Sequence, residues 1–371
     1  MSEYCPAHIL VTGGAGFIGA NFVHYWLAQH PGDRVTVLDA LTYAGNRENL
    51  GKTSENDGFR FVHGDIRDID LLETLLSQYN IDTIVHFAAE SHVDRSIHGP
   101  DAFIETNVTG THTLLKAARK VFLDTGTGRP HRFHHVSTDE VYGTLGPDDP
   151  AFTESHPYRP NSPYAASKAS SDHLVRSYRE TYGLSTAISN CSNNYGPFQF
   201  PEKLIPLIII NILENKPLPV YGDGLQVRDW LFVDDHNAAL DLVIRKGKIG
   251  ETYNIGGRNE WTNIEIVRHL CRLLDEEFSK NPDLCTRFPT APGNFGRSAA
   301  DLVTHVKDRP GHDRRYAVNA EKIRDTLGFM PSETFESGIR KTVRWYLENE
   351  SWWRRVMDGS YKQWIRKNYA G

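Results

Sequence analysis

The stretch HILVTGGAGFIG, residues 8–19, decides the fold prediction. Its first five residues are rich in Ile, Leu and Val, and they predict a buried strand over His8–Thr12. Glycines then recur with the spacing G-x-x-G-x-x-G, at Gly13, Gly16 and Gly19. Glycine permits the tight turn, lets a pyrophosphate approach the backbone, and lets the following helix pack closely on the strand. The stretch therefore predicts a dinucleotide-binding turn at a helix N-terminus, with Phe17 and Ile18 beside the cofactor.

The chain on either side of this turn alternates short β-type runs with helical patterns. Further strands are predicted at 34–38, 59–63, 83–87, 132–137 and 185–190, and helices at 17–29, 68–79, 101–123 and 164–182. Such alternation is typical of βαβ units with right-handed crossovers. The predicted fold class is α/β, with a doubly wound parallel Rossmann sheet that forms a cofactor domain over residues 1–190.

The pattern changes after about residue 191, where prolines and glycines become frequent and the alternation fails. Short strands are predicted at 230–232 and 252–255, helices at 262–278 and 321–327, and a helical cap in the aromatic-rich segment 345–369. We predict a smaller, mixed α/β substrate-binding domain over 191–371. Segments near 228–256 are expected to cross back to the first domain.

Composition and charge narrow the class of protein. The formal net charge of −6 argues against a broad nucleic-acid-binding face, which is usually basic. The four cysteines form no CxxC pair, as expected for free thiols in a reducing compartment. The longest apolar run, 205–213, is too short to span a bilayer, and no signal-peptide pattern opens the sequence. We expect a cytoplasmic protein with no membrane partner.

Acidic and small residues at the later strand ends indicate which cofactor is bound. Asp39 ends the second predicted strand, about 20 residues after Gly19, where a carboxylate accepts ribose hydroxyls and repels a 2′-phosphate. This favours NAD over NADP. Contacts are also expected after the third and fourth predicted strands, from Asp65, Ile66, Phe87, Ala88 and Ala89.

Tyr164 and Lys168 form a candidate redox centre. Their i, i+4 spacing places both on one face of the predicted helix. A free tyrosine has a pKa near 10, but a neighbouring ammonium and a positively charged nicotinamide both favour the phenolate. We therefore expect Tyr164 to act as the base of an oxidation, and Lys168 to hold the nicotinamide ribose as well.

The glycine turn, Asp39 and the Tyr-x-x-x-Lys motif resemble those of the extended short-chain dehydrogenase/reductase superfamily, whose members commonly act on sugar nucleotides. A finer resemblance lies in STDEVYG, residues 137–143, where the triplet Thr138-Asp139-Glu140 resembles that of the 4,6-dehydratases. Further stretches resemble the dehydratases of dTDP-glucose, at 39–46, 88–96, 190–197, 201–206, 227–231 and 308–312. Only 281–300 could not be aligned with that family.

The resemblance implies a reaction and roles for the triplet. Such enzymes oxidise C4 of dTDP-glucose, eliminate water across C5 and C6, and return the hydride to C6, so that NAD is regenerated. Tyr164 would remove the C4 hydroxyl proton and Thr138 would hydrogen-bond the C4 oxygen. Glu140 would then remove the C5 proton while Asp139 protonates the leaving C6 hydroxyl. Two adjacent carboxyls with separated pKa values can divide the work in this way.

The resemblance also assigns binding residues and an assembly. Near the cofactor it adds Leu41, Thr42, Thr106 and Asn194. For the nucleotide sugar it assigns Ser91, Asn193, Lys203, Leu204, Pro219, Tyr221, Arg228, Asn263, Asp308, Arg309 and His312. Lys203, Arg228 and Arg309 would neutralise the diphosphate. A homodimer through 101–123 and 164–182 is implied as well.

No metal site is predicted, because His134 and His135 lie on a strand and point to opposite faces. His131 is near them in the sequence, but it is not predicted to form a metal site with them. Cys191 is interpreted as a packing residue. Three alternatives stay open: a 4,6-dehydratase of a UDP-, CDP- or GDP-sugar, a 4-epimerase, and a non-enzymatic module that senses NAD. The acidic pair Asp139-Glu140 argues against an epimerase, which needs neither a C5 base nor a C6 acid.

Overall fold

The computed structural model describes residues 3–126 and 128–357. Its largest part is a parallel sheet with strand order β10-β6-β5-β4-β1-β2-β3. The strands are β1 (His8–Thr12), β2 (Arg34–Asp39), β3 (Phe59–His63), β4 (Thr83–His86), β5 (Arg132–Thr138), β6 (Thr186–Cys191) and β10 (Thr252–Ile255). The predicted doubly wound α/β fold and its six N-terminal strands are confirmed, with ends shifted by one residue at most.

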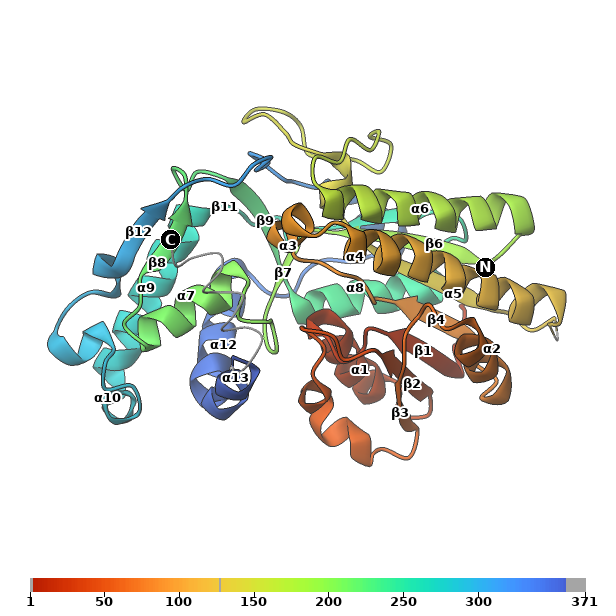
Figure 1. Cartoon of the computed structure of the whole chain (residues 1–371), viewed down its shortest axis with the longest axis horizontal. Helices are drawn as coiled ribbons and strands as arrows, with labels where there is room; N and C mark the ends of the chain where they lie inside the picture. The colour runs from red at the N-terminus through yellow and green to blue at the C-terminus, as the bar shows by residue number, and fades with distance from the viewer. Residues whose placement is uncertain (1–2, 127, 358–371) are drawn as a thin grey trace.

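Helices cover both faces of this sheet (Figure 1). One face carries α1 (Phe17–Gln29) and α8 (Val233–Lys246), while the other carries α2 (Ile69–Gln78), α5 (Thr111–Arg119) and α6 (Pro163–Tyr182). The alternation of side chains along β1 explains this division. Ile9 and Val11 pack with the first set of helices and Leu10 with the second. Both faces are therefore buried, as the apolar strands require.

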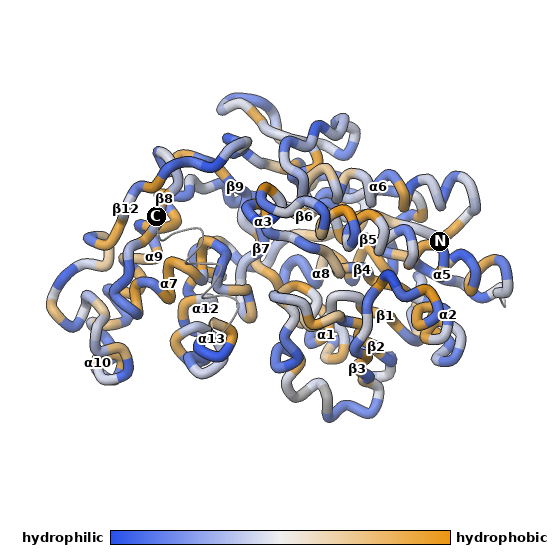
Figure 2. Tube along the Cα trace, viewed as in Figure 1, coloured by the Kyte–Doolittle hydropathy of each residue, from blue (hydrophilic) through white to orange (hydrophobic). Residues whose placement is uncertain are grey.

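The second unit is smaller and mixed. It contains the sheet β11-β9-β7 and the strand pair β12-β8. These strands are β7 (Asn193–Tyr195), β8 (Leu218–Tyr221), β9 (Val227–Phe232), β11 (Glu260–Thr262) and β12 (Val303–Val306). Its helices include α7 (Leu204–Leu213), α9 (Asn263–Lys280), α12 (Phe335–Glu348) and α13 (Glu350–Val356), which share one apolar core. The hydrophobic colouring along α7 in Figure 2 marks its place in that core.

Helices α7 and α8 of this half have no counterpart in the sequence prediction. Pro206 lies within the apolar run of α7, but it is in the first turn, where the helix does not need a backbone N–H donor. Helix α8 begins directly after β9, with acidic Asp234 and Asp235 in its first turn and basic Arg245 and Lys246 in its last. No glycine or proline separates β9 from α8, whereas Pro201 lies in the turn before α7.

Part of the chain after residue 191 lies against the large sheet. Helix α8 packs beside α1, β10 forms the sheet edge next to β6, and α11 (Glu321–Leu327) packs beside β10. The division into domains at residue 190 stays a prediction. Of the expected aromatic cap at 345–369, the structure gives the end of α12 and all of α13, and residues 358–369 lie outside the described part. None of the helices in that part is long and apolar enough to cross a membrane.

The C-terminal helix α13 is tied to the cofactor half through one indole. Trp352 is buried and donates from Nε1 to Oδ1 of Asn49, 2.8 Å away, and Asn49 donates in turn to the carbonyl of Ala15 in the glycine turn. The ring also packs on Trp345, with centroids 5.0 Å apart. The first turn of α13 and the first loop of the chain are therefore linked by two hydrogen bonds.

Trp352→Ala should lower the free energy of unfolding by about 3–5 kcal/mol, because it leaves a cavity and an unpaired Asn49. Trp352→Phe keeps most of the packing and should lose only about 1 kcal/mol. Urea unfolding followed by circular dichroism measures both. Met330→Ala, at an exposed position, is the control and should change stability by less than about 0.5 kcal/mol. Equal stabilities for the Trp352→Ala and Met330→Ala variants would contradict this assignment.

Candidate functional site

Two adjoining cavities lie at the carboxyl ends of the parallel strands, on the side that faces the second unit. The first cavity, of about 350 Å³, runs from the glycine turn past Asp39 to Tyr164 and Lys168. The second cavity opens toward α7, β8 and β9, and both are lined by Ser91, Glu140 and Lys203. Ligands of open α/β sheets bind at this edge, where the strand order reverses.

The three glycines of the turn have different physical reasons to be glycine. Gly13 has a φ of +69°, and a Cβ on it would lie 2.6 Å from the backbone nitrogen of Ala88. A Cβ on Gly19 would lie 2.3 Å from the carbonyl oxygen of Gly13. Gly16 lines the first cavity, and a Cβ there would meet only that oxygen, at 3.3 Å. The fold itself requires Gly13 and Gly19, whereas Gly16 leaves bare backbone for a ligand.

Asp39 holds the turn in place. Its Oδ2 accepts from the backbone nitrogen of Ala15 at 2.9 Å, and its Oδ1 accepts from that of Leu41 at 2.8 Å. Burial raises the pKa of this carboxyl, and the two backbone donors oppose that rise. Each oxygen can accept a second hydrogen bond, so the group still fits a ribose diol.

The predicted cofactor residues are brought together, with one exception. The first cavity is lined by Gly13, Gly16, Phe17, Ile18, Gly19, Asp39, Thr42, Asp65, Ile66, Phe87, Ala88, Ala89, Thr106, Tyr164, Lys168 and Asn194. The exception is Leu41, which does not line the cavity and whose N–H serves Asp39 instead. The bare backbone at Gly16, the carboxylate of Asp39 and the buried ammonium of Lys168 fit NAD.

The reacting groups meet where β5 ends and α6 begins. Ser162 caps α6 by accepting from the nitrogen of Ala165, which fixes Tyr164 in the first turn. The hydroxyls of Thr138 and Tyr164 are hydrogen-bonded, and Thr138 Oγ1 lies 3.4 Å from Oδ1 of Asp139. Burial, and then the charge of Glu140, raise the pKa of Tyr164 well above its usual value. Phenolate formation therefore needs positive charge beside the ring.

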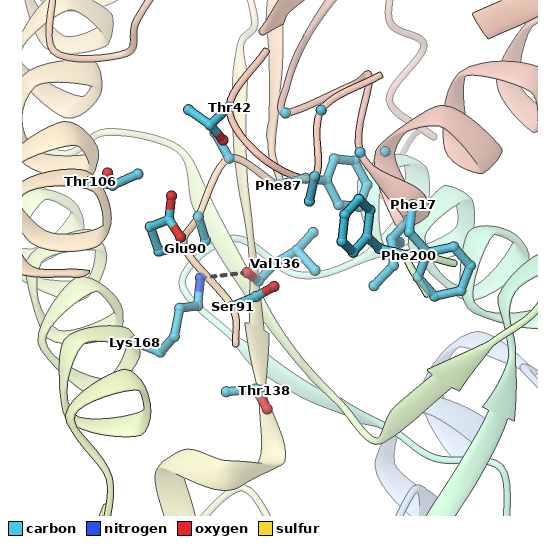
Figure 3. Close-up of a pocket in the computed structure, with 18 of the residues that line it drawn as sticks. Phe17, Thr42, Phe87, Glu90, Ser91, Thr106, Val136, Thr138, Lys168 and Phe200 are labelled. Carbon is cyan, nitrogen blue, oxygen red and sulfur yellow. Dashed lines mark hydrogen bonds between the residues drawn. The ribbon is translucent and has the colours of Figure 1, made fainter. Parts of the chain in front are cut away.

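Lys168 supplies such a charge from within the protein. Its Nζ donates to the carbonyl of Val136 at 2.9 Å, as the dashed line in Figure 3 shows, and lies 3.4 Å from Nε2 of His135. Burial lowers the pKa of Lys168 to about 8, although the nearby carboxyl of Asp172 opposes that fall. Burial likewise raises the pKa of Asp172 to about 6. The ammonium is thus positioned by a carbonyl, and burial makes this amine a weaker base than that of an ordinary lysine.

Asp139 is buried and Glu140 is half-buried, and the surroundings of the two carboxyls differ. Burial and the charge of Glu140 raise the pKa of Asp139 well above that of an ordinary aspartate. Burial also raises the pKa of Glu140, but three cations, Arg309, Arg228 and Lys203, oppose that rise. Asp139 is therefore suited to hold a proton while Glu140 stays charged, which is the separation that an acid and a base require.

The second cavity gathers the residues assigned to the nucleotide sugar. It is lined by Ser91, Asn193, Lys203, Leu204, Pro219, Tyr221, Arg228, Asn263, Arg309 and His312. Thr138 lines the first cavity instead, and Asp308 lines neither. Asp308 accepts from the nitrogen of Arg309 at 2.9 Å, and its Oδ1 lies 2.6 Å from Nδ1 of His312. Asp308 therefore stabilises the loop that carries Arg309 and His312 without lining either cavity.

The cations of this cavity already have partners within the chain. Arg309 pairs with Asp94 at 3.1 Å, and Lys203 donates to the carbonyl of Ser91 at 2.9 Å. Arg228 donates to two backbone carbonyls, and its guanidinium lies 4.2 Å from the ring centroid of Tyr316. These contacts fix the positions of the charges before any ligand arrives.

Several lining residues had not been singled out from the sequence, although three of them lie in stretches already matched to the dehydratases. They are Tyr43, Glu90, Gln199, Phe200 and Glu202, of which Figure 3 shows Glu90 and Phe200. Asp172 was missed as well, although it continues the i, i+4 series from Tyr164 and Lys168 and could have been found from that spacing. In the described part of the chain, no three His, Cys, Asp or Glu side chains could hold a metal ion.

Gly16→Val should weaken NAD binding by about tenfold or more, because the side chain would occupy the space over the bare backbone. Loss of one hydrogen bond to a charged group costs about 1.5–3 kcal/mol, and 1.4 kcal/mol is tenfold in affinity. Calorimetric titration of the cofactor-stripped protein measures this, and unfolding should be almost unchanged. Gly32→Val, at an exposed turn with open space around it, is the matched control. Unchanged affinity in the Gly16→Val variant would refute the assigned place of the pyrophosphate.

Comparison with known proteins gives a consistent result. A family model described as GDP-mannose 4,6 dehydratase matches residues 10–342. The chain is 54% identical over 373 residues to dTDP-glucose 4,6-dehydratase 1 of Escherichia coli K12, covering 98% of this chain and 99% of that protein. It is 55% identical over 356 residues to the dTDP-glucose 4,6-dehydratase of Neisseria meningitidis serogroup B, covering 95% and 97%.

Solved structures agree with this. DesIV, the dTDP-glucose 4,6-dehydratase of Streptomyces venezuelae, solved with NAD and TYD bound, superposes with a TM-score of 0.83 at 49% identity, covering 94% of this chain and 99% of that one. The UDP-glucose 4-epimerase of Thermus thermophilus, solved with NAD, gives a TM-score of 0.77 at 28% identity, covering 92% and 99%. The chain belongs to the dTDP-glucose 4,6-dehydratase family of the extended short-chain dehydrogenases/reductases.

Proposed function

We propose that this protein uses NAD to convert dTDP-glucose into dTDP-4-keto-6-deoxyglucose, with loss of one water. The observation that carries the proposal is the triplet at the end of β5. Thr138 is hydrogen-bonded to the phenol of Tyr164. Asp139 and Glu140 are the next two residues of the chain, and Glu140 lines both cavities. A sugar held in the second cavity would present C4 to Tyr164 and C5 and C6 to the two carboxyls.

Oxidation at C4 opens the reaction. Tyr164 takes the proton of the C4 hydroxyl, with Thr138 hydrogen-bonded to the same oxygen and Lys168 supplying positive charge. NAD bound along the first cavity accepts the hydride from C4 and gives it back at C6. The glycine turn and Asp39 hold its phosphates and adenosine ribose, and Lys168 holds the nicotinamide ribose.

Elimination follows because the C4 ketone acidifies the hydrogen on C5. Glu140 removes that proton, and Asp139 protonates the C6 hydroxyl, which leaves as water. Burial and the charge of Glu140 raise the pKa of Asp139 well above its usual value, which favours the protonated acid. Arg309, Arg228 and Lys203 oppose the rise that burial causes in the pKa of Glu140, which favours the charged base. One pair of neighbouring side chains thus supplies both the acid and the base.

The second cavity supports a nucleotide sugar as the substrate class. Lys203, Arg228 and Arg309 lie there in fixed positions and can neutralise a diphosphate. The other residues proposed to bind the sugar and the base line the same cavity, except Thr138 and Asp308. Asp308 stabilises the loop that carries Arg309 and His312. Other nucleotide sugars and 4-epimerisation remain the alternatives, and the carboxyl pair Asp139-Glu140 argues against the epimerase.

We also infer a homodimer formed through α5 and α6. Two apolar side chains beside these helices support it: Ile104, just before α5, is 49% exposed and Tyr182, at the end of α6, is 42% exposed. A cytoplasmic location stays a prediction from the sequence.

Glu140→Gln should separate oxidation from elimination. With dTDP-glucose it should still reduce bound NAD, seen as absorbance at 340 nm, because Tyr164 and Lys168 are intact. Formation of the 4-keto-6-deoxy sugar should fall by about 100-fold or more, the usual contribution of a positioned base. Tyr164→Phe is the control and should lose the 340 nm signal as well. Near-normal product formation by the Glu140→Gln variant would remove Glu140 from its role.

The proposed substrate and the hydride return can be tested together. The purified protein is offered dTDP-, UDP-, CDP- and GDP-glucose without added NAD, and the products are analysed by mass spectrometry. Only the dTDP sugar should lose one water at an appreciable rate, and C4-deuterated dTDP-glucose should give product with deuterium at C6 of the same molecule. A product of unchanged mass from UDP-glucose would favour an epimerase, and label in free NADH would contradict the internal return.

A further inference from the structure

The dehydration leaves two protein groups in the wrong protonation state after each turnover, if the proposed function holds. The substrate loses the proton of its C4 hydroxyl to Tyr164. The departing water carries a proton from Asp139, while Glu140 returns to C5 the proton that it removed. At the end of the cycle Tyr164 has one proton too many and Asp139 has one too few. A proton must pass between them before the next substrate can react.

The hydroxyl of Thr138 lies between these two groups. It is hydrogen-bonded to the phenol of Tyr164 and donates from Oγ1 to Oδ1 of Asp139 over 3.4 Å. The backbone nitrogen of Glu140 donates to the same oxygen at 3.3 Å, which fixes the hydroxyl at the end of β5. A hydroxyl can donate one hydrogen bond while it accepts others, so this geometry suits proton transfer through it.

We propose that Thr138 relays a proton from Tyr164 to Asp139 and thereby resets the site after each turnover. The O–H bond of Tyr164 breaks as a new O–H bond forms on Thr138 Oγ1. The original Thr138 proton moves to Oδ1 of Asp139. One negative charge passes from the carboxylate to the phenolate, no electrons are exchanged, and nothing else is consumed.

Bulk water has poor access to Asp139, the carboxyl that must regain a proton. Asp139 is 2% exposed, and its Oδ2 is buried without a hydrogen-bond partner in the described part of the chain. Burial and the charge of Glu140 make Asp139 a stronger proton acceptor than an ordinary carboxylate. The ammonium of Lys168 and a positively charged nicotinamide lower the pKa of the phenol, against the effect of burial.

A second route leads away from Tyr164 behind Lys168. Nζ of Lys168 lies 3.4 Å from His135 Nε2, which lies 3.2 Å from Oδ1 of Asp172. Asp172 is also hydrogen-bonded to the half-buried Tyr158. This route could take the proton from Tyr164, but from Asp172 it leads to Ser137 and Tyr158 rather than to Asp139, and it would leave the Asp139 carboxylate without its proton. Only the Thr138 route serves both groups at once.

The test compares the first turnover with later ones. Thr138→Val has nearly the same shape but no hydroxyl, and Thr138→Ser keeps the hydroxyl. With enzyme in excess and then with dTDP-glucose in excess, rapid-quench measurements give the rates of first and later turnovers. In the Thr138→Val variant, later turnovers should be slower than the first by about tenfold or more, and imidazole should speed them by acting as an external acid and base. The native and Thr138→Ser proteins should show equal rates that do not depend on buffer concentration.

Asp172→Asn is the control for the second route and should keep first and later turnovers equal. The proposal is wrong if Thr138→Val slows both phases equally without response to imidazole, or if Asp172→Asn alone slows the later turnovers. Failure of the proposed function is a different result, because the native protein would then give no dehydrated sugar even in the first turnover.

Discussion

The loop after β1 lies so close to the end of β4 that position 13 has no room for a side chain. A Cβ on Gly13 would lie 2.6 Å from the nitrogen of Ala88. This contact occurs where the strand order reverses, with β2 and β3 on one side of β1 and β4, β5 and β6 on the other. The crossovers diverge there and leave a crevice at the carboxyl ends. The first cavity is that crevice, and the positions of Asp39, Ala89 and Thr138 around it follow from the strand order.

The second unit completes the site by closing the open side of the crevice. The chain leaves β6, forms β7 beside the first cavity and continues into the loop before α7, which supplies Lys203. Its return through α8 and β10 then attaches this unit to the large sheet. The acidic pair sits at the junction, and Glu140 lines both cavities. Burying a carboxyl destabilises a fold, and here the burial of Asp139, together with the cations beside Glu140, produces the separation of pKa that the chemistry requires.

The sequence predicted the large sheet well because its strands are buried on both faces and read as continuous apolar runs. The prediction from the sequence missed α7 and α8, for two different reasons. Helix α7 is apolar all round and has no period of 3.6, while α8 follows β9 with no turn residue between them. Tertiary packing determines both helices.

The site was predictable to the extent that its residues are neighbours along the chain. The glycine turn, the triplet at 138–140 and the Tyr164–Lys168 pair are local patterns with a physical reason for each residue type. Residues joined only by folding were not found in this way. Glu202 pairs with Arg95 at 3.3 Å, across more than a hundred positions. The sugar-side residues came from family resemblance, because no spacing rule connects Ser91 with Arg228 or His312.

The arrangement of groups around Thr138 explains why so much of this chemistry can take place out of contact with water. The hydride that leaves C4 returns to C6 of the same sugar, so no electron carrier has to be exchanged with solvent. This internal return of the hydride would be of limited use if Asp139 still had to take up a proton from solvent before each new turnover. Tyr164, Thr138 and Asp139 are hydrogen-bonded in series within one turn of chain and the start of α6. Their order matches the direction in which the proton must travel, from the group that receives it to the group that lost it.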